Sequence, residues 1–423
     1  MKVRLDSPEG PQVMSPSATI DHFAKQARLR QTQWEQRLAE YPDAFAEIEQ
    51  EIDQHYRQGA GHLVAALLEK VTEQPAMAEQ TERIRQQATV PLRAPQARPL
   101  RVRLLCGLVL FVSTWYCAPR RGKQGSARPP EQQAGLYPEL AALGFGKGCS
   151  PALQYTVARI VALSPSIAVA RKELARQGIG LDTKAVRRIA EQLGTQMLAL
   201  RQRELLAWRA GQLPAGSDFA SRRVAVQIDG GRVRLRENKK RTKKQRRRKG
   251  QREKFDTPWR EPKVLTIFEI DERGKMIKKH RQPLIDGTLL GPDHLAELLA
   301  YHLHRLGVAQ AELVVFVSDG ARWIWDRLEW IERRAGLDPS RTVHVLDFCH
   351  AAHHVSLALQ TLAWDETQRR ETYGRLRKLL KGSRWEEVVD QLIGWARGQP
   401  ENSAVWTEIR YLNSHGQEGH LNY

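Results

Sequence analysis

The hydrophobic and polar positions of the chain predict a helical beginning followed by a mixture of strands and helices. From about Ile20 to Gln87, apolar residues recur at roughly helical spacing among Glu, Gln and Arg, which predicts helices. The segment Thr89–Arg103 is rich in Pro and Arg and is typical of a linker. The apolar run Leu104–Tyr116 is too short to span a bilayer and rich in β-formers, so we expect one or two strands there.

A second helical pattern runs from Ser150 to Gly194 and reads helix, helix, turn, helix. The turn contains Gly178 and Gly180, and Asp182 or Thr183 can cap the next helix, expected over Lys184–Leu193. This helix carries Arg187 and Arg188 on one side and apolar residues on the other. The layout is that of a helix-turn-helix, although many helical hairpins share it without contacting nucleic acid.

Two strand-like apolar runs each end in Asp-Gly, at Asp229-Gly230 and at Asp319-Gly320. A buried strand with a carboxylate at its carboxyl end, followed by a glycine for a tight turn, can place an acid beside a divalent metal. Two Mg²⁺ ions about 3.5–4 Å apart can activate an attacking oxygen and stabilise a leaving one, and such hard cations prefer carboxylates. Asp-Gly also occurs in ordinary turns, but two copies in a matching order favour a metal site at Asp229 and Asp319.

The elements between the two acids support that order. A strand is expected over Val264–Asp271, its continuation after a turn over Gly274–Gln282, and a helix over Asp293–Leu306. Strand, strand, strand, helix, strand is the order of the ribonuclease H-like fold, an α/β class with a mixed sheet flanked by helices. In that fold the first acid lies on the first strand and the second acid on the fourth.

A fifth strand is expected over Thr342–Leu346, directly before Asp347 and His350. The pair Asp347/His350 could bind zinc or assist catalysis as an accessory element. A tetrahedral zinc site would need two more ligands, so a structural role at the strand-to-helix turn, or contact with an extrahelical base, is equally consistent.

The charge of the chain changes the picture, because 67 Lys and Arg against 48 Asp and Glu give a net charge of +19. Such a surplus favours phosphate polyanions as partners, although a ribosome-associated protein or mere solubility would also account for it. The run from Lys239 to Lys254 holds eleven basic residues and one acid between two strand candidates. A charge run of this kind is often a solvated loop or a localisation signal. Its place between two strands favours a hairpin tip that contacts DNA phosphates beside Asp229, through Lys239, Lys240, Arg241, Lys243, Lys244, Arg246, Arg247, Arg248 and Lys249.

Several motifs in this order resemble bacterial insertion-sequence transposases of the ISKra type, over roughly Ser150 to Tyr423. The motifs are Ile228-Asp229-Gly230-Gly231, Trp259-Arg260-Glu261-Pro262-Lys263-Val264, Ser318-Asp319-Gly320-Ala321-x-Trp323-Ile324-Trp325 and Leu346-Asp347-Phe348-x-His350. The Asp347/His350 pair is similar to the Cys/Asp-x-x-His element of Mutator-like transposases.

The resemblance implies a DDE mechanism in which Asp229 and Asp319 hold two Mg²⁺ ions, with Mn²⁺ as a substitute. Water would cleave a transposon end, and the freed 3′-hydroxyl would then attack target DNA. The implied partners are double-stranded DNA, namely terminal inverted repeats and target, and further copies of the chain assembled on DNA, with no membrane. The implied location is the bacterial cytoplasm, at the nucleoid.

The chain departs from the family pattern in two places. The second cysteine of a zinc-ribbon-like Cys-x-x-Cys is absent near Cys117, so zinc is not expected there. The family's catalytic Glu, in a Gly-Ser-Gly-x-x-Glu-like motif, would follow Tyr423. We therefore expect the chain as given to bind DNA and to cleave it poorly, since misplacing the reacting phosphate can cost about 100-fold in rate.

The expected segments are a helical N-terminal region (1–95), a small β/loop segment (96–149), the helix-turn-helix (150–200), a connecting helix (201–222), the ribonuclease H-like catalytic core (223–354), and a helical insertion with the end of the core (355–423). The N-terminal helices would bind DNA ends or dimerise, or else form a packing domain or coiled-coil arm. Two alternatives to a transposase stay open: a non-catalytic DNA-binding remnant or repressor, and a nuclease acting on RNA hybrids.

Overall fold

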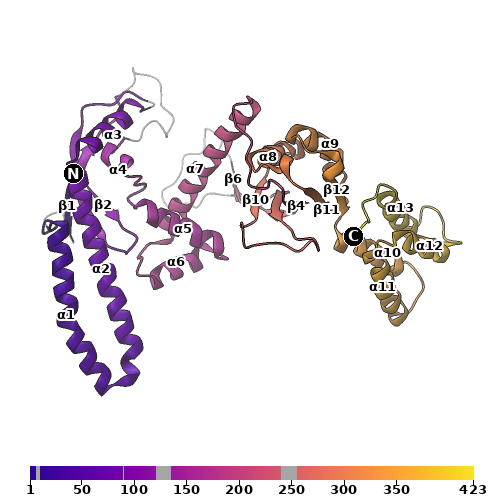
Figure 1. The fold of residues 1–423 in the computed structure, drawn as a ribbon, viewed down its shortest axis with the longest axis horizontal. Coiled ribbons are helices and arrows are strands. Elements are labelled where there is room, and N and C mark those ends of the chain that lie inside the picture. The colour runs from indigo at the N-terminus through magenta and orange to yellow at the C-terminus, as the bar shows by residue number, and fades with distance from the viewer. Residues whose placement is uncertain (6–9, 89, 121–134, 240–254) are drawn as a thin grey trace. The chain divides into compact units, whose positions relative to one another are not determined.

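The computed structural model describes residues 1–5, 10–88, 90–120, 135–239 and 255–423. The chain forms two compact units, Met1–Arg201 and Gln202–Tyr423 (Figure 1). The division falls inside the long helix α7, Thr183–Arg209. The fold class is α/β, with a mixed sheet of five strands in the second unit.

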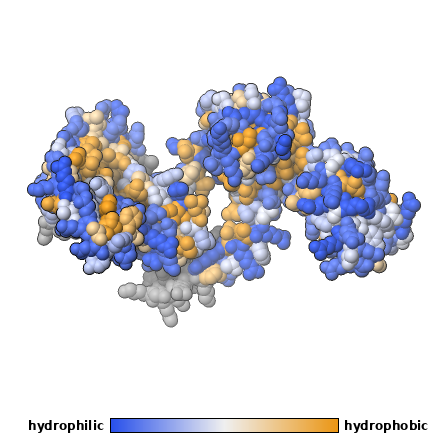
Figure 2. Space-filling view, turned by 60° about the horizontal axis from the view of Figure 1, so that its bottom comes forward, coloured by the Kyte–Doolittle hydropathy of each residue, from blue (hydrophilic) through white to orange (hydrophobic). Residues whose placement is uncertain are grey.

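The N-terminal unit begins with the helices that the apolar spacing predicts. Helices α1 (Pro16–Glu40) and α2 (Phe45–Val71) form a long hairpin, and α3 (Pro75–Gln86) follows (Figure 1). Ser15 caps α1 by accepting a hydrogen bond from Ala18 N. Hydrophobic side chains also reach the surface of this unit (Figure 2), and the exposed large ones on the hairpin include Ile20, Leu29, Phe45 and Tyr56.

A three-stranded antiparallel sheet completes the first half of this unit. Its order is β1 (Lys2–Leu5), β3 (Val109–Tyr116), β2 (Gln96–Arg103). The linker expected over Thr89–Arg103 is therefore wrong for its second half. Pro99 is tolerated because β2 is an edge strand, where a missing N–H leaves no ladder bond unmade on the outer side.

The helix-turn-helix region is built from α5 (Pro151–Leu163), α6 (Ile167–Arg176) and α7, after the short α4 (Pro138–Ala142). Gly178 has a φ of +75°, a conformation in which a side chain would be strained. Asp182 caps α7 by accepting from Ala185 N at 2.7 Å. The core beneath the helices consists of Leu153, Val157, Leu174, Ile179, Val186, Ile189 and their neighbours.

Helix α7 differs from its predicted length. It continues past Leu193 to Arg209, and the connecting helix expected over 201–222 is only its last part. The segment after Arg209 is not helical up to β4, because Gly211 adopts a φ of +69° just beyond the helix end.

The sheet of the C-terminal unit has the order β10-β9-β4-β11-β12. Strands β4, β11 and β12 are parallel, whereas β9 runs antiparallel to β4 and β10 antiparallel to β9. Helices α8 and α9 pack with the sheet in one hydrophobic core. The bounds are β4 Arg223–Gly230, β9 Lys263–Glu269, β10 Leu284–Thr288, α8 Pro292–Arg305, β11 Leu313–Ser318, α9 Arg322–Ala335 and β12 Thr342–Leu346.

One strand of this sheet is misplaced in the prediction. The third strand is Leu284–Thr288 and not Gly274–Gln282, in which only Met276 forms an isolated bridge, with Ile270. The basic and polar residues from Lys278 to Gln282 give that segment no apolar face to bury.

Between β4 and β9 the chain forms a narrow arm of two short antiparallel pairs. Strand β5 (Val233–Arg234) pairs with β8 (Trp259–Arg260), and β6 (Glu237–Asn238) pairs with β7 (Phe255–Asp256). The arm therefore extends from the end of β4 that carries Asp229.

Four helices follow the sheet, as predicted: α10 (Phe348–Gln360), α11 (Glu366–Lys381), α12 (Trp385–Ala396) and α13 (Ala404–Gln417). The resemblance to ISKra-type transposases implies a helical insertion here, and the residues expected on its apolar face all belong to the common core of these helices, namely Trp364, Leu376, Leu379, Leu380, Trp385, Val388, Leu392 and Trp395. Within the described residues, no helix combines the length and apolar content needed to cross a membrane.

Candidate active site

Three aspartates lie at one level at the carboxyl ends of three neighbouring parallel strands. The strand register places Ile228 of β4 beside Ser318 of β11, and Ser318 beside Leu346 of β12. The next residues on these strands are Asp229, Asp319 and Asp347. Because adjacent strands are about 4.8 Å apart, the three backbone positions span about 10 Å along one edge of the sheet.

Each of the three carboxylates is held by one backbone N–H. Gly230 N donates to Asp229 Oδ1 at 2.6 Å, Ala321 N to Asp319 Oδ1 at 2.9 Å, and His350 N to Asp347 Oδ1 at 2.9 Å. A carboxylate has two oxygens and about four lone-pair directions, so one such bond orients it and leaves capacity for a further ligand.

The three acids line a common pocket of about 480 Å³. Among the described residues, no Lys or Arg forms an ion pair with any of them. The pocket therefore gathers three carboxylates that have no Lys or Arg partner in the described part of the chain. Its other lining residues are Gln227, Ile228, Val317, Ser318, Cys349, His350 and His353.

The side chains around this pocket fit a hard divalent cation. Besides the carboxylates, Ser318 Oγ is buried with no hydrogen-bond partner among the described residues, and Ser318 lines the pocket itself. Carboxylate oxygens and an unpartnered hydroxyl suit a partly hydrated Mg²⁺ or Mn²⁺ ion, which keeps several of its waters. Asp229, Asp319 and Asp347 are the residues that would hold it.

The main chain of Asp319 is fixed by residues far along the sequence. Trp325 Nε1 donates to Asp319 O at 2.8 Å. The hydroxyl of Tyr411, from α13, lies so close to Gly320 that a Cβ built there would be 1.6 Å away from it. Burial raises the pKa of Tyr411, and the nearby Asp319 carboxylate raises it further, so the phenol stays protonated. Gly320 is therefore required by close packing with Tyr411.

A line of imidazoles connects the pocket to α13. His350 Nε2 lies 3.2 Å from His354 Nε2, and His354 Nδ1 pairs with the Glu408 carboxylate. If His354 Nδ1 donates its proton to Glu408, its Nε2 accepts, so His350 carries its proton on Nε2 and leaves Nδ1 as an acceptor. Tyr411 stacks on His354 with 3.8 Å between ring centroids.

The two motifs on either side of Asp229 meet in space. Lys263 Nζ lies 5.2 Å from the centre of the Trp323 ring and 3.7 Å from Glu261 Oε2. A Cβ built on Gly230 would be 3.2 Å from Glu261 Oε1 and 3.4 Å from Trp323. The Trp-Arg-Glu-Pro-Lys segment and the segment after Asp319 therefore enclose the turn that follows Asp229.

The arm between β4 and β9 carries arginines stacked on exposed aromatic rings. The Arg234 guanidinium lies 4.9 Å from the Trp259 ring centre, and Arg236 lies 3.9 Å from Phe255. Trp259 and Phe255 are 58% and 47% exposed, so these faces are available to solvent and to a partner. Arginine and aromatic side chains in this combination are frequent in surfaces that contact nucleic acid.

The basic segment predicted to grip DNA is described only at its first residue. Lys239 is exposed and its Nζ lies 2.9 Å from Asp256 Oδ1. The other predicted contacts lie outside the described residues: Lys240, Arg241, Lys243, Lys244, Arg246, Arg247, Arg248 and Lys249. The residues flanking the segment pair with each other as β6 and β7, so its two ends start side by side.

Arg187 and Arg188 lie on the exposed side of α7, as predicted, while Val186 and Ile189 are buried in the core of the helix-turn-helix. Arg103 steadies this region by donating to Gly180 O at 2.8 Å.

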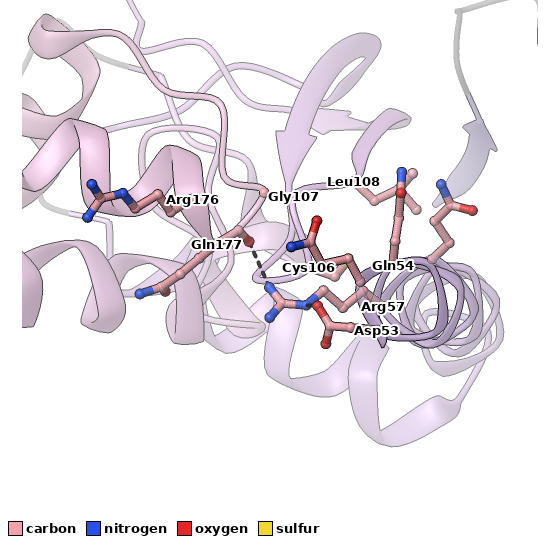
Figure 3. A pocket seen from close by; sticks show the side chains of 11 residues that line it. Asp53, Gln54, Arg57, Cys106, Gly107, Leu108, Arg176 and Gln177 are labelled. Atoms are coloured by element: carbon pink, nitrogen blue, oxygen red, sulfur yellow. Dashed lines mark hydrogen bonds and ion pairs between the residues drawn. The ribbon is translucent and has the colours of Figure 1, made fainter. Parts of the chain in front are cut away.

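A larger pocket, of about 700 Å³, lies in the N-terminal unit between α2, the β2–β3 turn and the end of α6 (Figure 3). Its charged groups already have partners, since Arg57 Nε pairs with Asp53 at 2.7 Å and Arg57 donates to Gln177 O at 2.7 Å. Its lining includes one acid and no group of side chains that could bind a ligand together, so we interpret it as a polar gap between packed elements.

The sequence reasoning missed three features of the acid pocket. Asp347 was expected to be only an accessory residue. Three apolar runs that each end in Asp could have indicated three acids at the same edge of the sheet. The sequence carries no signal for Tyr411 or for Glu408, because both contact His354, beside the pocket, only through the packing of α13 on α10. Asp347 also has the structural role that was the alternative expectation, because it caps the N-terminus of α10.

Comparison with known proteins adds no name to this geometry, because no family model, no curated protein and no solved structure matches the chain.

Proposed function

We propose that this protein cleaves and joins DNA phosphodiester bonds as a transposase, with Asp229, Asp319 and Asp347 as its metal-binding acids. The observation that carries the proposal is the level placement of these acids at the ends of β4, β11 and β12. Asp347 supplies a third carboxylate at the pocket, independently of the Glu that the resemblance to ISKra-type transposases implies.

The topology supports the same proposal. If β4, β9, β10, β11 and β12 are numbered one to five along the chain, their order across the sheet is 3-2-1-4-5. Strand β9, the second, is antiparallel to both of its neighbours. This is the arrangement of ribonuclease H-like sheets, to which we assign residues 223–354. Residues 150–200 would then contribute DNA contacts through Arg187 and Arg188, and the arm would bring Trp259 and the basic segment to the DNA beside Asp229.

The chemistry follows from the residues of the pocket. When bound, Mg²⁺ or Mn²⁺ would polarise the phosphoryl oxygens and lower the pKa of an attacking water. The three aspartates would hold the ion beside the reacting phosphate, and Trp325 would hold the backbone of Asp319. His350 Nδ1, with its tautomer set by His354 and Glu408, would accept a proton within the pocket.

The test is a cleavage assay on supercoiled plasmid and on duplexes that carry the DNA flanking the gene, with Mg²⁺ or Mn²⁺ at fixed salt. We expect metal-dependent nicking that Asp229→Ala and Asp319→Ala each reduce by at least about 100-fold. Asp326→Ala, a change of an exposed acid on α9, is the matched control and should keep activity. Nicking that survives both pocket substitutions would overturn the proposal, and preference for RNA–DNA hybrids would favour the nuclease alternative.

A non-catalytic DNA-binding protein, a remnant or repressor of a mobile element, is the second candidate. The exposed Arg187 and Arg188 favour it, because a helix-turn-helix can bind DNA without any contribution from the acid pocket. DNA binding that requires these arginines, together with absence of metal-dependent nicking on every substrate, would support this candidate over the first.

A further inference from the structure

A second cluster of metal-binding side chains lies at the end of α13, away from the three aspartates. His415 lies in the last turn of the helix, Glu418 is its C-cap, and His420 follows Gly419, whose φ is +78°. His415 Nδ1 and His420 Nδ1 are 2.9 Å apart, and Glu418 Oε2 is 3.3 Å from His420 Nδ1. One ligand atom from each residue lies within 4.8 Å of the others, so the three side chains are close enough to share one ion.

The distances match those between ligands of one metal ion. Two ligands each about 2.05 Å from zinc subtend about 90° when they are 2.9 Å apart, and about 105° when they are 3.3 Å apart. An ideal tetrahedral angle needs only a few tenths of an ångström more between the two imidazoles. Two imidazoles and one carboxylate are also a donor set of zinc sites that keep one position open, whereas Mg²⁺ prefers oxygen ligands alone.

The surroundings hold the cluster in shape. The His420 side chain is 11% exposed, and its ring stacks on Trp325 with centroids 4.0 Å apart and planes at 26°. His415 packs against both Trp325 and Tyr411. His420 N also donates to His415 O at 2.9 Å, and Leu346 N donates to His420 O at 2.8 Å, which fixes the backbone of the turn.

We propose that His415, Glu418 and His420 form a binding site for zinc or a similar transition-metal ion, with a structural role. The ion would join the last turn of α13 to the segment that follows it and so hold His420 against Trp325. Trp325 in turn donates to Asp319 O, so the site would help to hold the backbone of Asp319 through Trp325. The site does not depend on the proposed DNA chemistry.

The test measures metal binding directly on the full chain. Protein freed of metal by chelator is titrated with Co²⁺, whose visible absorption distinguishes tetrahedral from octahedral coordination, and then with Zn²⁺ in competition with a metal indicator. We expect one equivalent of tetrahedral Co²⁺, displaced by Zn²⁺ and not by excess Mg²⁺. His415→Ala and Glu418→Gln should each weaken binding by more than the roughly 10–100-fold typical of outer-shell partners.

Two controls examine the neighbouring histidines as sources of metal binding. His353→Ala removes an exposed histidine and should leave binding unchanged, and the double variant His350→Ala/His354→Ala tests the other close imidazole pair. Circular dichroism checks that each variant is folded. Folded wild-type protein that binds no Co²⁺ or Zn²⁺ would overturn the proposal, since the 2.9 Å contact between His415 and His420 is then only a hydrogen bond between two rings. Loss of binding in the double variant with full binding in His415→Ala would also overturn it.

Discussion

The two polar clusters of the C-terminal unit are built in opposite ways. Asp229, Asp319 and Asp347 owe their positions to strand register, and single backbone N–H groups hold their carboxylates. His415 and His420 owe theirs to side-chain packing on Trp325 and Tyr411. Strand register fixes the backbone position of a residue, whereas packing fixes the position of its terminal side-chain atoms. Substitution of an acid should therefore change chemistry with little change in fold, and substitution around the imidazoles should change both.

The largest effect that separates the two clusters is expected from Asp347→Asn. Asparagine is as good an N-cap as aspartate, so α10 should keep its start while the pocket loses one negative charge. We expect metal-dependent DNA cleavage to fall by about 100-fold, with thermal unfolding nearly unchanged. Asp338→Asn is the control for both measurements, because Asp338 caps the short 3-10 helix Pro339–Arg341, which precedes β12. Equal cleavage by Asp347→Asn and wild type would reduce Asp347 to a capping residue.

A smaller effect is expected between the two clusters, at Gly320, where the turn after Asp319 packs against Tyr411. Gly320→Ala brings a Cβ against the Tyr411 hydroxyl, so α13 or the Asp319 turn must move. Overpacking of this kind costs about 1–3 kcal/mol in the free energy of unfolding, measurable by urea denaturation. Gly231→Ala, beside the other Asp-Gly turn, meets no atom within 4 Å and should change stability by less than about 0.5 kcal/mol. Similar stability of the two variants would show that the turn after Asp319 and α13 are not closely packed at Gly320.

The smallest effect is a dependence of stability on pH at His354, which lies between the two clusters and stacks on Tyr411. Burial lowers the pKa of His354 below its ordinary 6.5 despite the attraction of Glu408, with His350 and His353 lowering it further and neutral Tyr411 stacked on it. The unfolded chain therefore binds more protons just below pH 6.5, so stability is complete above that pH and declines as pH falls through it.

His354→Gln should reduce this decline, measured as urea midpoints between pH 5 and 8. His22→Gln, at an exposed histidine of α1, should keep it. A decline that is unchanged in His354→Gln would assign the pH dependence to other groups.

Much of the fold could be predicted because the strands of the sheet are dense apolar runs. Strands β4, β9, β11 and β12 fall within a residue or two of their predicted positions, and so do α8 and the apolar face of α11 and α12. Strand β10 was misplaced because Leu284–Thr288 is short and lies at the edge of the sheet, where half of its residues need no apolar side chain.

The parts of the site that could not be predicted depend on contacts between distant residues. Nothing local to Tyr411 indicates that it packs on Gly320, and nothing local to Glu408 indicates that it pairs with His354. These positions are set by how α13 packs on α10, and many apolar faces of similar width would satisfy the same spacing. Asp229 and Asp319, by contrast, could be placed from pattern alone, because an apolar strand fixes the position of the residue that comes after it.

The contact between Gly320 and Tyr411 also sets an order of events during synthesis. Residue 411 leaves the ribosome 92 residues after residue 319, which at 5–20 residues per second is a delay of about 5 to 18 seconds. During that interval the first strands of the sheet can already pair, but the turn of Asp319 lacks the phenol that closes it. A nascent chain would thus contain Asp319 well before Tyr411 could pack against the turn that follows it.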